Sequence, residues 1–123
     1  MSEPKNKTLI LGASANPSRY SYLALNRLKS KGHEVVAIGK KQNTVAGVEI
    51  ETGKKDWKGI DTITVYLNPL RQQEYYDYIL SLKPRRIIFN PGAENTELYQ
   101  LAKKNNIKPV EACTLVMLST GQY

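Results

Sequence analysis

The sequence predicts an α/β domain with a mostly parallel five-stranded sheet and helices on both faces of the sheet. Short apolar runs alternate along the chain with stretches of helical periodicity, as in sheets built from right-handed crossovers. Most of these runs end at glycine, asparagine or proline, residues that close a buried strand. The length fits a single domain over residues 1–123, because two domains of half that size would each bury too small a core.

The first part of the chain predicts a strand, a helix and a second strand. Residues 8–11 form an apolar run that stops at Gly12, and residues 34–38 form another that stops at Gly39. Between them, residues 20–31 have helical spacing. This stretch ends in lysines followed by a glycine, as helix C-termini often do.

The rest of the chain continues the alternation. Residues 45–50 fit either a small hairpin or a loop that carries a short strand. Residues 62–67 are apolar and β-branched, which predicts a third buried strand, and residues 70–82 carry apolar side chains at the spacing of one helical face. The remaining predicted elements are a strand over residues 86–89, a helix capped by Asn95, a strand over residues 108–111 and a short helix over residues 114–118.

Composition excludes several classes of protein. The hydrophobic (41%) and charged (24%) fractions are those of a globular domain, and no apolar run approaches the roughly 20 residues that cross a bilayer. The first residues are polar and lack the apolar segment of a signal peptide, so we expect a cytoplasmic protein that binds no membrane. One cysteine, Cys113, and one histidine, His33, leave neither a disulfide nor a conventional metal site.

The net charge of +7 favours an anionic partner. Nucleic acid is one candidate, but the positive residues occur as separate pairs and not as one basic segment, so we do not expect it. A phosphorylated small molecule is another candidate. The structural alternative is a set of solvated surface lysines with no ligand.

The loop after the first strand has the composition of a phosphate-binding turn. In parallel sheets, ligands bind beyond the carboxyl ends of the strands, where the strand order reverses. Gly12, Ala13 and Ser14 are small, so backbone N–H groups can approach a diphosphate at the start of the following helix. Arg19 and Ser21 add a charged fork and a hydroxyl. The alternative is a tight turn that needs glycine and binds nothing.

The end of the second strand discriminates between nucleotides. A domain that binds NAD usually places an acidic residue there, which accepts hydrogen bonds from the ribose. Here the residues are Ile38, Gly39, Lys40 and Lys41, with no acid. A ligand with an additional ribose phosphate fits such an end, which indicates NADP or coenzyme A, unless both lysines are ordinary surface residues.

Three further segments follow strand ends. Leu67–Pro69 close the third strand, Asn90–Gly92 open onto the helix capped by Asn95, and the thiol of Cys113 opens the last helix. The alternatives are plain connections and a small buried side chain. We expect no catalytic residue, since neither a Ser–His or Cys–His arrangement nor a carboxylate pair stands at these ends.

Three motifs in this order, over residues 11–21, 90–95 and 111–118, resemble those of the small stand-alone CoA-binding domain proteins. These proteins are similar to the nucleotide-binding domain of the succinyl-CoA synthetase alpha subunit. The resemblance covers the whole chain and implies a Rossmann-like three-layer fold that binds CoA across the strand ends. The synthetase's phosphohistidine belongs to a second domain that has no counterpart here, so the resemblance implies no reaction.

The resemblance also assigns each loop a place along CoA. One departure concerns the adenosine end, where many relatives have an Asn-Pro pair and this chain has Gly39-Lys40. The carried-over positions are Gly12, Ala13 and Ser14 at the diphosphate with Arg19 and Ser21 nearby, Ile38, Gly39 and Lys40 at the adenosine, Leu67, Asn68 and Pro69 beside the adenine, and Asn90, Pro91 and Gly92 along the pantetheine. Cys113 follows the fifth strand on the same side of the sheet as Asn90–Gly92, so we expect it near the CoA thiol.

The functional prediction is therefore a protein that binds coenzyme A or an acyl-CoA and has no catalytic machinery of its own. A homodimer, or an accessory role beside a CoA-using enzyme, is a further expectation. The alternative is an NADP-binding, oxidoreductase-like domain. A chain of 123 residues leaves no room for the substrate domain that such an enzyme needs.

Overall fold

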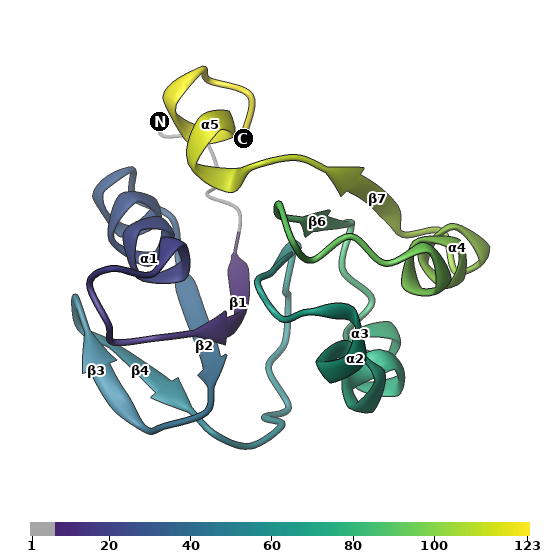
Figure 1. Ribbon diagram of the computed structural model, residues 1–123, viewed down its shortest axis with the longest axis horizontal. Helices are drawn as coiled ribbons and strands as arrows, with labels where there is room; N and C mark the ends of the chain where they lie inside the picture. Colours follow the sequence, from purple (N-terminus) through teal and green to yellow (C-terminus); the bar gives the residue numbers. More distant parts are fainter. Residues whose placement is uncertain (1–6) are drawn as a thin grey trace.

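A computed structural model describes residues 7–123, which build one seven-stranded sheet (Figure 1). Neighbouring strands run parallel, except that β3 is antiparallel to β4. The predicted α/β class and mostly parallel sheet are confirmed. In sheet order the strands are β3 (Asn43–Val45), β4 (Val48–Glu51), β2 (Val35–Gly39), β1 (Thr8–Ala13), β5 (Thr62–Val65), β6 (Arg86–Phe89) and β7 (Lys108–Glu111).

The prediction of five strands is wrong, because the ambiguous segment after β2 forms the hairpin β3–β4. Its two turn residues, Ala46 and Gly47, both have positive φ (51° and 80°), as the tightest two-residue hairpin turns require. Alanine rarely takes the first of these positions, so the sequence carries only half of the usual turn signal. The hairpin extends the sheet because β4 pairs with β2.

The helix predicted over residues 70–82 is divided in the structure. The fully buried Gln72 explains the break, since its amide donates hydrogen bonds to the carbonyls of Leu67 and Ala93 (2.8 Å each) and holds the first turn against two loops. The helices are α1 (Tyr20–Ser30), α2 (Pro69–Gln72), the 3-10 turn η1 (Gln73–Tyr75), α3 (Tyr76–Leu82), α4 (Thr96–Lys104) and α5 (Thr114–Ser119).

The helices cover both faces of the sheet and make three layers (Figure 1). Successive residues of β1 point to opposite faces. Leu9 and Leu11 pack in one core with Ile79 of α3 and with α4, while Ile10 packs in the other with Leu25 of α1 and with α5. Within residues 7–123, no helix has the length and apolar character needed to span a membrane.

The strand order reverses beside β1. From β1 the chain crosses to β2 on one side, and after the hairpin it returns to β5 on the other side of β1. The loops that follow β1 and β5 therefore lead away from each other. Parallel sheets form a crevice between two such loops, at the carboxyl ends of the strands. The sequence predicts a ligand-binding site at this crevice.

Candidate functional site

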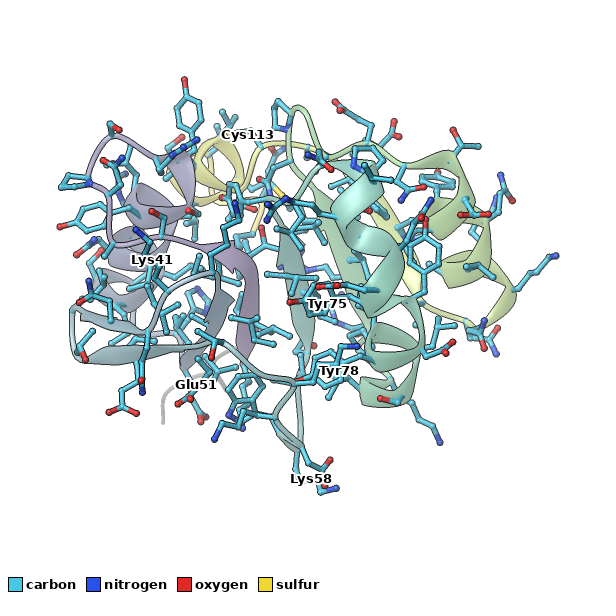
Figure 2. All side chains as sticks on the ribbon, turned by 60° about the horizontal axis from the view of Figure 1, so that its bottom comes forward. Lys41, Glu51, Lys58, Tyr75, Tyr78 and Cys113 are labelled. Carbon is cyan, nitrogen blue, oxygen red and sulfur yellow. The ribbon has the colours of Figure 1, made fainter. Side chains whose placement is uncertain are left out.

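A groove with a volume of about 1360 Å³ lies at this crevice. The loops after β1, β2 and β5, together with α2 and η1, form its walls. Its volume exceeds the roughly 300–1,000 Å³ of most small-molecule pockets, so it suits a long ligand. In Figure 2, Lys41 and Tyr75 lie on opposite sides of this groove, with the central strands between them.

Gly12 brings the two central loops into contact. Its φ is +100°, a conformation that residues with a side chain rarely adopt. A Cβ atom there would lie 3.1 Å from the backbone nitrogen of Leu67 and 3.2 Å from the carbonyl carbon of Tyr66. Glycine is therefore required both for the turn and for the close approach of the loop after β5.

Glycine is required at position 39 for a different steric reason. A Cβ atom at this position would lie 2.3 Å from the carbonyl oxygen of Ala13 and 2.8 Å from the Cγ2 atom of Ile50. The end of β2 thus packs directly beneath the turn that follows β1. This contact brings Lys40 and Lys41, next in the chain, to the groove.

Local hydrogen bonds shape the loop between β1 and α1. The Ser14 hydroxyl oxygen accepts from the backbone N–H of Asn16 (3.0 Å). The Asn16 side-chain oxygen accepts from the backbone N–H of Ser18 (3.0 Å) and from its hydroxyl (2.8 Å). The Asn16 carbonyl accepts from the backbone N–H of Arg19 (3.0 Å). These contacts order the loop before any ligand arrives.

The N-terminus of α1 opens toward this loop without a side-chain cap. Arg19 occupies the N-cap position and makes no side-chain capping hydrogen bond, and the first turn contains no acidic residue. Helix N-termini carry partial positive charge and unpaired N–H groups, which favour anions. Ser21, which is buried at this end, lines the groove as predicted.

The groove carries an excess of positive charge. Arg19, Lys40, Lys41 and Arg71 line it, and Glu74 is the one acidic residue in the lining. All four basic side chains are exposed, and within residues 7–123 none of them forms an ion pair. They are therefore available to an anionic ligand.

Ten of the fifteen predicted site residues line the groove. Five others, namely Asn68, Pro69, Asn90, Gly92 and Cys113, lie outside the lining. Three loops supply most of the ten, and Pro91 comes from the loop after β6. The ten are Gly12, Ala13, Ser14, Arg19, Ser21, Ile38, Gly39, Lys40, Leu67 and Pro91.

Asn90 has a structural role at the ends of β5 and β6. It is buried, and its amide donates hydrogen bonds to Thr64 Oγ1 (2.7 Å) and to the Val65 carbonyl (2.9 Å). Its side-chain oxygen accepts from the backbone N–H of Thr114 (2.9 Å). Asn90 thus joins the end of β5 to the start of α5, and it lies outside the groove lining.

Asn68 and Pro69 begin α2 in the usual way. The Asn68 side-chain oxygen accepts from the backbone N–H of Arg71 (2.9 Å), and Pro69 takes the first helical position. Gly92 has φ +93°, and its N–H donates to a Glu94 carboxylate oxygen (2.9 Å). These residues shape the loops that carry their groove-lining neighbours.

Cys113 occupies the N-cap position of α5, outside the groove lining (Figure 2). It is half-buried. Its neighbour Tyr66 does line the groove, and burial of the phenol beside Thr64 and Thr114 raises the pKa of Tyr66 to about 12. The phenol therefore stays neutral at physiological pH.

Thirteen groove-lining residues lie outside the fifteen predicted site residues. The sequence places Tyr75 on the apolar face of a helix, whereas in the structure it ends η1 and lines the groove, where Lys54 Nζ lies 5.3 Å from its ring centroid. The sequence does carry a signal for Leu70 and Arg71 as site residues, because they directly follow the predicted site residues Asn68 and Pro69. The thirteen are Ala15, Asn16, Ser18, Tyr20, Lys41, Asn43, Thr52, Tyr66, Leu70, Arg71, Gln73, Glu74 and Tyr75.

The side chains that line the groove are suited to binding phosphate and polar groups. They supply hydroxyls, amides and four cations, with no histidine or cysteine among them. Within residues 7–123, no group of three or more His, Cys, Asp or Glu side chains is arranged to hold a metal ion. The groove thus offers the chemistry of anion recognition.

Solved structures share this fold. The chain is 51% identical to an uncharacterized protein of known crystal structure, with a TM-score of 0.95 over 98% of this chain and 100% of the other. A hypothetical protein from Pyrococcus horikoshii OT3 (19% identity, TM-score 0.85, 94% and 83% coverage) and a Thermus thermophilus protein (20%, 0.84, 97% and 91%) show the same fold.

No curated protein sequence matches the chain. The family model of the CoA binding domain, however, matches residues 6–119. This match covers the sheet, the groove and all of the helices up to the end of α5. The chain therefore belongs to the CoA-binding domain family.

Proposed function

We propose that the protein binds coenzyme A along the groove at the carboxyl ends of β2, β1 and β5. Membership of the CoA-binding domain family supports the ligand. The observation that carries the placement is the groove itself, which lies at the strand-order reversal and has four unpaired cations in its lining. The proposed ligand is anionic and long, as this groove requires.

The diphosphate of CoA would lie over Gly12–Ser14 and the start of α1. The side chains of this turn are small, and the side-chain oxygens of Ser14 and Asn16 accept hydrogen bonds from backbone N–H groups of the same loop. The N-terminus of α1 has neither a side-chain cap nor an acidic residue in its first turn, which favours a phosphate there. Arg19 extends from the N-cap position and can form charge-assisted hydrogen bonds with a phosphate.

The 3′-phosphoadenosine end would lie at the end of β2. Lys40 and Lys41 follow this strand, and Asn43 and Thr52 complete the polar lining. A phosphate monoester carries a charge of about −1.5 to −2 at pH 7, which two exposed ammonium groups can balance. Tyr75 presents an aromatic ring in the same lining, on the opposite wall.

The pantetheine arm would then extend toward β5 and β6. Leu67, Leu70 and Pro91 line that part of the groove, and they follow these two strands in the chain. We further propose that the protein holds CoA and does not react with it, because the lining has no nucleophile–base pair. A sensor, carrier or accessory subunit fits this description. The homodimer and the cytoplasmic location stay predictions.

Calorimetric titration of the full chain with CoA, dephospho-CoA, NADP and NAD tests the proposal. We expect CoA to bind with one-to-one stoichiometry and more tightly than the other three ligands. The charge reversal Arg19→Glu should weaken CoA binding, while Lys104→Glu, on the exposed end of α4, serves as a matched control. Tighter binding of NADP than of CoA, or equal effects of both charge reversals, would contradict the proposal.

A further inference from the structure

Lys54 connects the segment after β4 to η1 at one end of the groove. Its Nζ atom donates a hydrogen bond to the Glu74 carbonyl oxygen (2.7 Å) and lies 5.3 Å from the ring centroid of Tyr75. Glu74 and Tyr75 line the groove, whereas Lys54 lies outside the lining. The contacts of Lys54 therefore hold this part of the groove wall from outside the groove.

Strand pairing places these contacts beside the basic end of β2. In the parallel pair of β2 and β4, Ile38 lies opposite Glu51. From these two residues the chain continues to Lys40 on one strand and to Thr52 on the other, and both of these residues line the groove. Lys54 is two residues further along, at most about 7 Å of extended chain. The ring that Lys54 contacts therefore lies on the wall that adjoins the ends of β2 and β4.

The ring of Tyr75 is also held by its packing. Tyr78 of α3 contacts it, with ring centroids 6.5 Å apart and planes inclined by 59°, and Figure 2 shows the two residues near each other. Tyr75 is half-buried and packs against a hydrophobic core of the protein. The other tyrosines of the lining differ, because Tyr20 is 71% exposed and Tyr66 packs against the core on the other face of the sheet. A ring that is held on one side and lines a groove on the other is suited to stacking with a base.

We propose that Tyr75 binds the adenine ring of the ligand by stacking, and that Lys54 is the positioning residue for the Tyr75 ring. The inference rests on the proposed function, because it takes CoA as the ligand and the end of β2 as the place of its 3′-phosphate. Adenine is the one aromatic group of CoA, and a single ribose joins it to the 3′-phosphate. The two walls of the groove then bind two parts of the same nucleoside, the phosphate at Lys40 and Lys41 and the base at Tyr75.

Calorimetric titration with CoA tests the stacking contact. Tyr75→Ala should weaken CoA binding about tenfold, near the lower end of what base–aromatic stacking contributes, because part of the ring is already covered. Tyr75→Leu keeps apolar packing against Tyr78 without an aromatic face, so it should show the same loss in a better packed variant. Tyr75→Phe restores the ring and should recover the CoA affinity of the parent protein to within about twofold.

Tyr99 of α4 provides the matched control. Its ring has similar neighbours, with the Phe89 ring centroid at 6.3 Å and Lys103 Nζ at 5.9 Å, but the residue lies outside the groove lining. Tyr99→Ala should therefore leave the CoA affinity unchanged. Urea unfolding of every variant establishes that the titrated protein is folded.

A spectroscopic measurement separates stacking from a structural role of Tyr75. The fluorescence of 1,N6-etheno-CoA, whose base is a modified adenine, falls when that base stacks on an aromatic ring. Binding to the parent protein and to Tyr75→Phe should quench this fluorescence, and saturated binding to Tyr75→Ala should not. Lys54→Ala should weaken CoA binding about threefold in the parent protein and not in the Tyr75→Ala background, because Lys54 acts through the ring.

Equal CoA affinities of the parent protein and the folded Tyr75→Ala and Tyr75→Leu variants would overturn the inference and leave the proposed function intact. An equal loss in Tyr75→Phe would also overturn it, because the hydroxyl and not the ring would then matter. Unquenched etheno-CoA in the complex with the parent protein would leave Tyr75 with a structural role only. An equal effect of Lys54→Ala in both backgrounds would refute its positioning role. If CoA does not bind the parent protein, the proposed function fails and this inference fails with it.

Discussion

The loop between β1 and α1 and the loop between β6 and α4 have the same sequence pattern and opposite structural roles. Each combines glycine, asparagine and proline at a strand end and opens onto a helix. In the first loop, the side-chain hydrogen bonds of Ser14, Asn16 and Ser18 stay within the loop, and the helix that follows has no side-chain cap. In the second, Asn90 and Asn95 are buried and bonded to three other segments. The two loops differ in whether their polar side chains form hydrogen bonds with other segments of the protein.

The same contrast explains the placement of the predicted site residues. Asn95 donates to Gln72 Oε1 and to the Tyr76 hydroxyl (2.9 Å each) and accepts from the backbone N–H of Leu98 (3.1 Å). Its polar atoms are therefore occupied, as are those of Asn90. The exposed Pro91 alone reaches the groove from this loop. Four comparisons, between variants or between ligands, test whether the two loops differ in this way.

The largest effect is expected at the glycines of the two loops. Gly12→Ala should lower the free energy of unfolding by about 2–5 kcal/mol, because strain at φ +100° adds to a Cβ contact of 3.1 Å with the next loop. Gly92→Ala is a matched control with φ +93° and nothing within 4 Å of its Cβ position, so it should lose about 1–3 kcal/mol from strain alone. Urea unfolding of both variants measures the difference.

CoA titration of the same two variants separates binding from stability. Folded Gly12→Ala should bind CoA at least tenfold more weakly than Gly92→Ala, because its added methyl group lies in the proposed diphosphate turn. Equal CoA affinities would show that the diphosphate does not approach Gly12. The contrast between the two loops would then concern stability alone.

The next effect compares two asparagines that the sequence treats alike. Asn90→Ala should cost about 2–4 kcal/mol, because it removes three buried hydrogen bonds and leaves the Thr114 N–H without its acceptor. Asn68→Ala removes one exposed helix cap and should cost about 1 kcal/mol. Thermal and urea unfolding measure both values. A cost for Asn90→Ala no larger than that for Asn68→Ala would refute the anchoring role of Asn90.

The sequence predicts the order of elements well because each strand is a continuous buried run. Ile63 and Ile87 are fully buried on one face of the sheet, and hydrophobic periodicity reports such burial directly. Contacts between distant residues leave no such signal. Gln72 looks like a surface glutamine in the sequence, yet its bonds to Leu67 and Ala93 interrupt the predicted helix. The hairpin at Ala46 is only one of two alternatives in the sequence for a local reason, because alanine is an unusual residue at such a turn.

The site is predictable only in part, for the same reason. The turn at Gly12–Ser14 and the basic end of β2 follow from local residue types, and the structure brings both to one groove. Leu70 and Tyr75 reach that groove because the helix predicted over residues 70–82 is divided, which follows from buried Gln72. Local patterns therefore identify the turn and the basic strand end, and they miss residues that packing brings to the groove.

A smaller effect concerns the polar end of the groove. CoA should bind about tenfold more tightly than dephospho-CoA, near the lower end of the roughly 1.5–3 kcal/mol of a charge-assisted contact, because Lys40 and Lys41 are exposed. The double variant Lys40→Ala/Lys41→Ala should reduce this preference to about twofold. Lys103→Ala/Lys104→Ala on α4 is the control. Equal affinities for the two ligands in the parent protein would remove Lys40 and Lys41 from the site.

The smallest effect is expected at Cys113, which tests whether the end of α5 belongs with the groove or with the anchored loop. Its thiol is half-buried at the N-cap of α5 and lies outside the groove lining. Attack of the Cys113 thiolate on CoA disulfide would form a mixed disulfide and release one CoA thiol. Because Cys113 lies outside the groove lining, we expect no reductant-sensitive mass gain of one CoA on the native protein. The same incubation in urea should give the adduct, which confirms that the reagent is active. A full adduct on the native fold, prevented by acetyl-CoA as competitor, would instead place the pantetheine thiol beside Cys113.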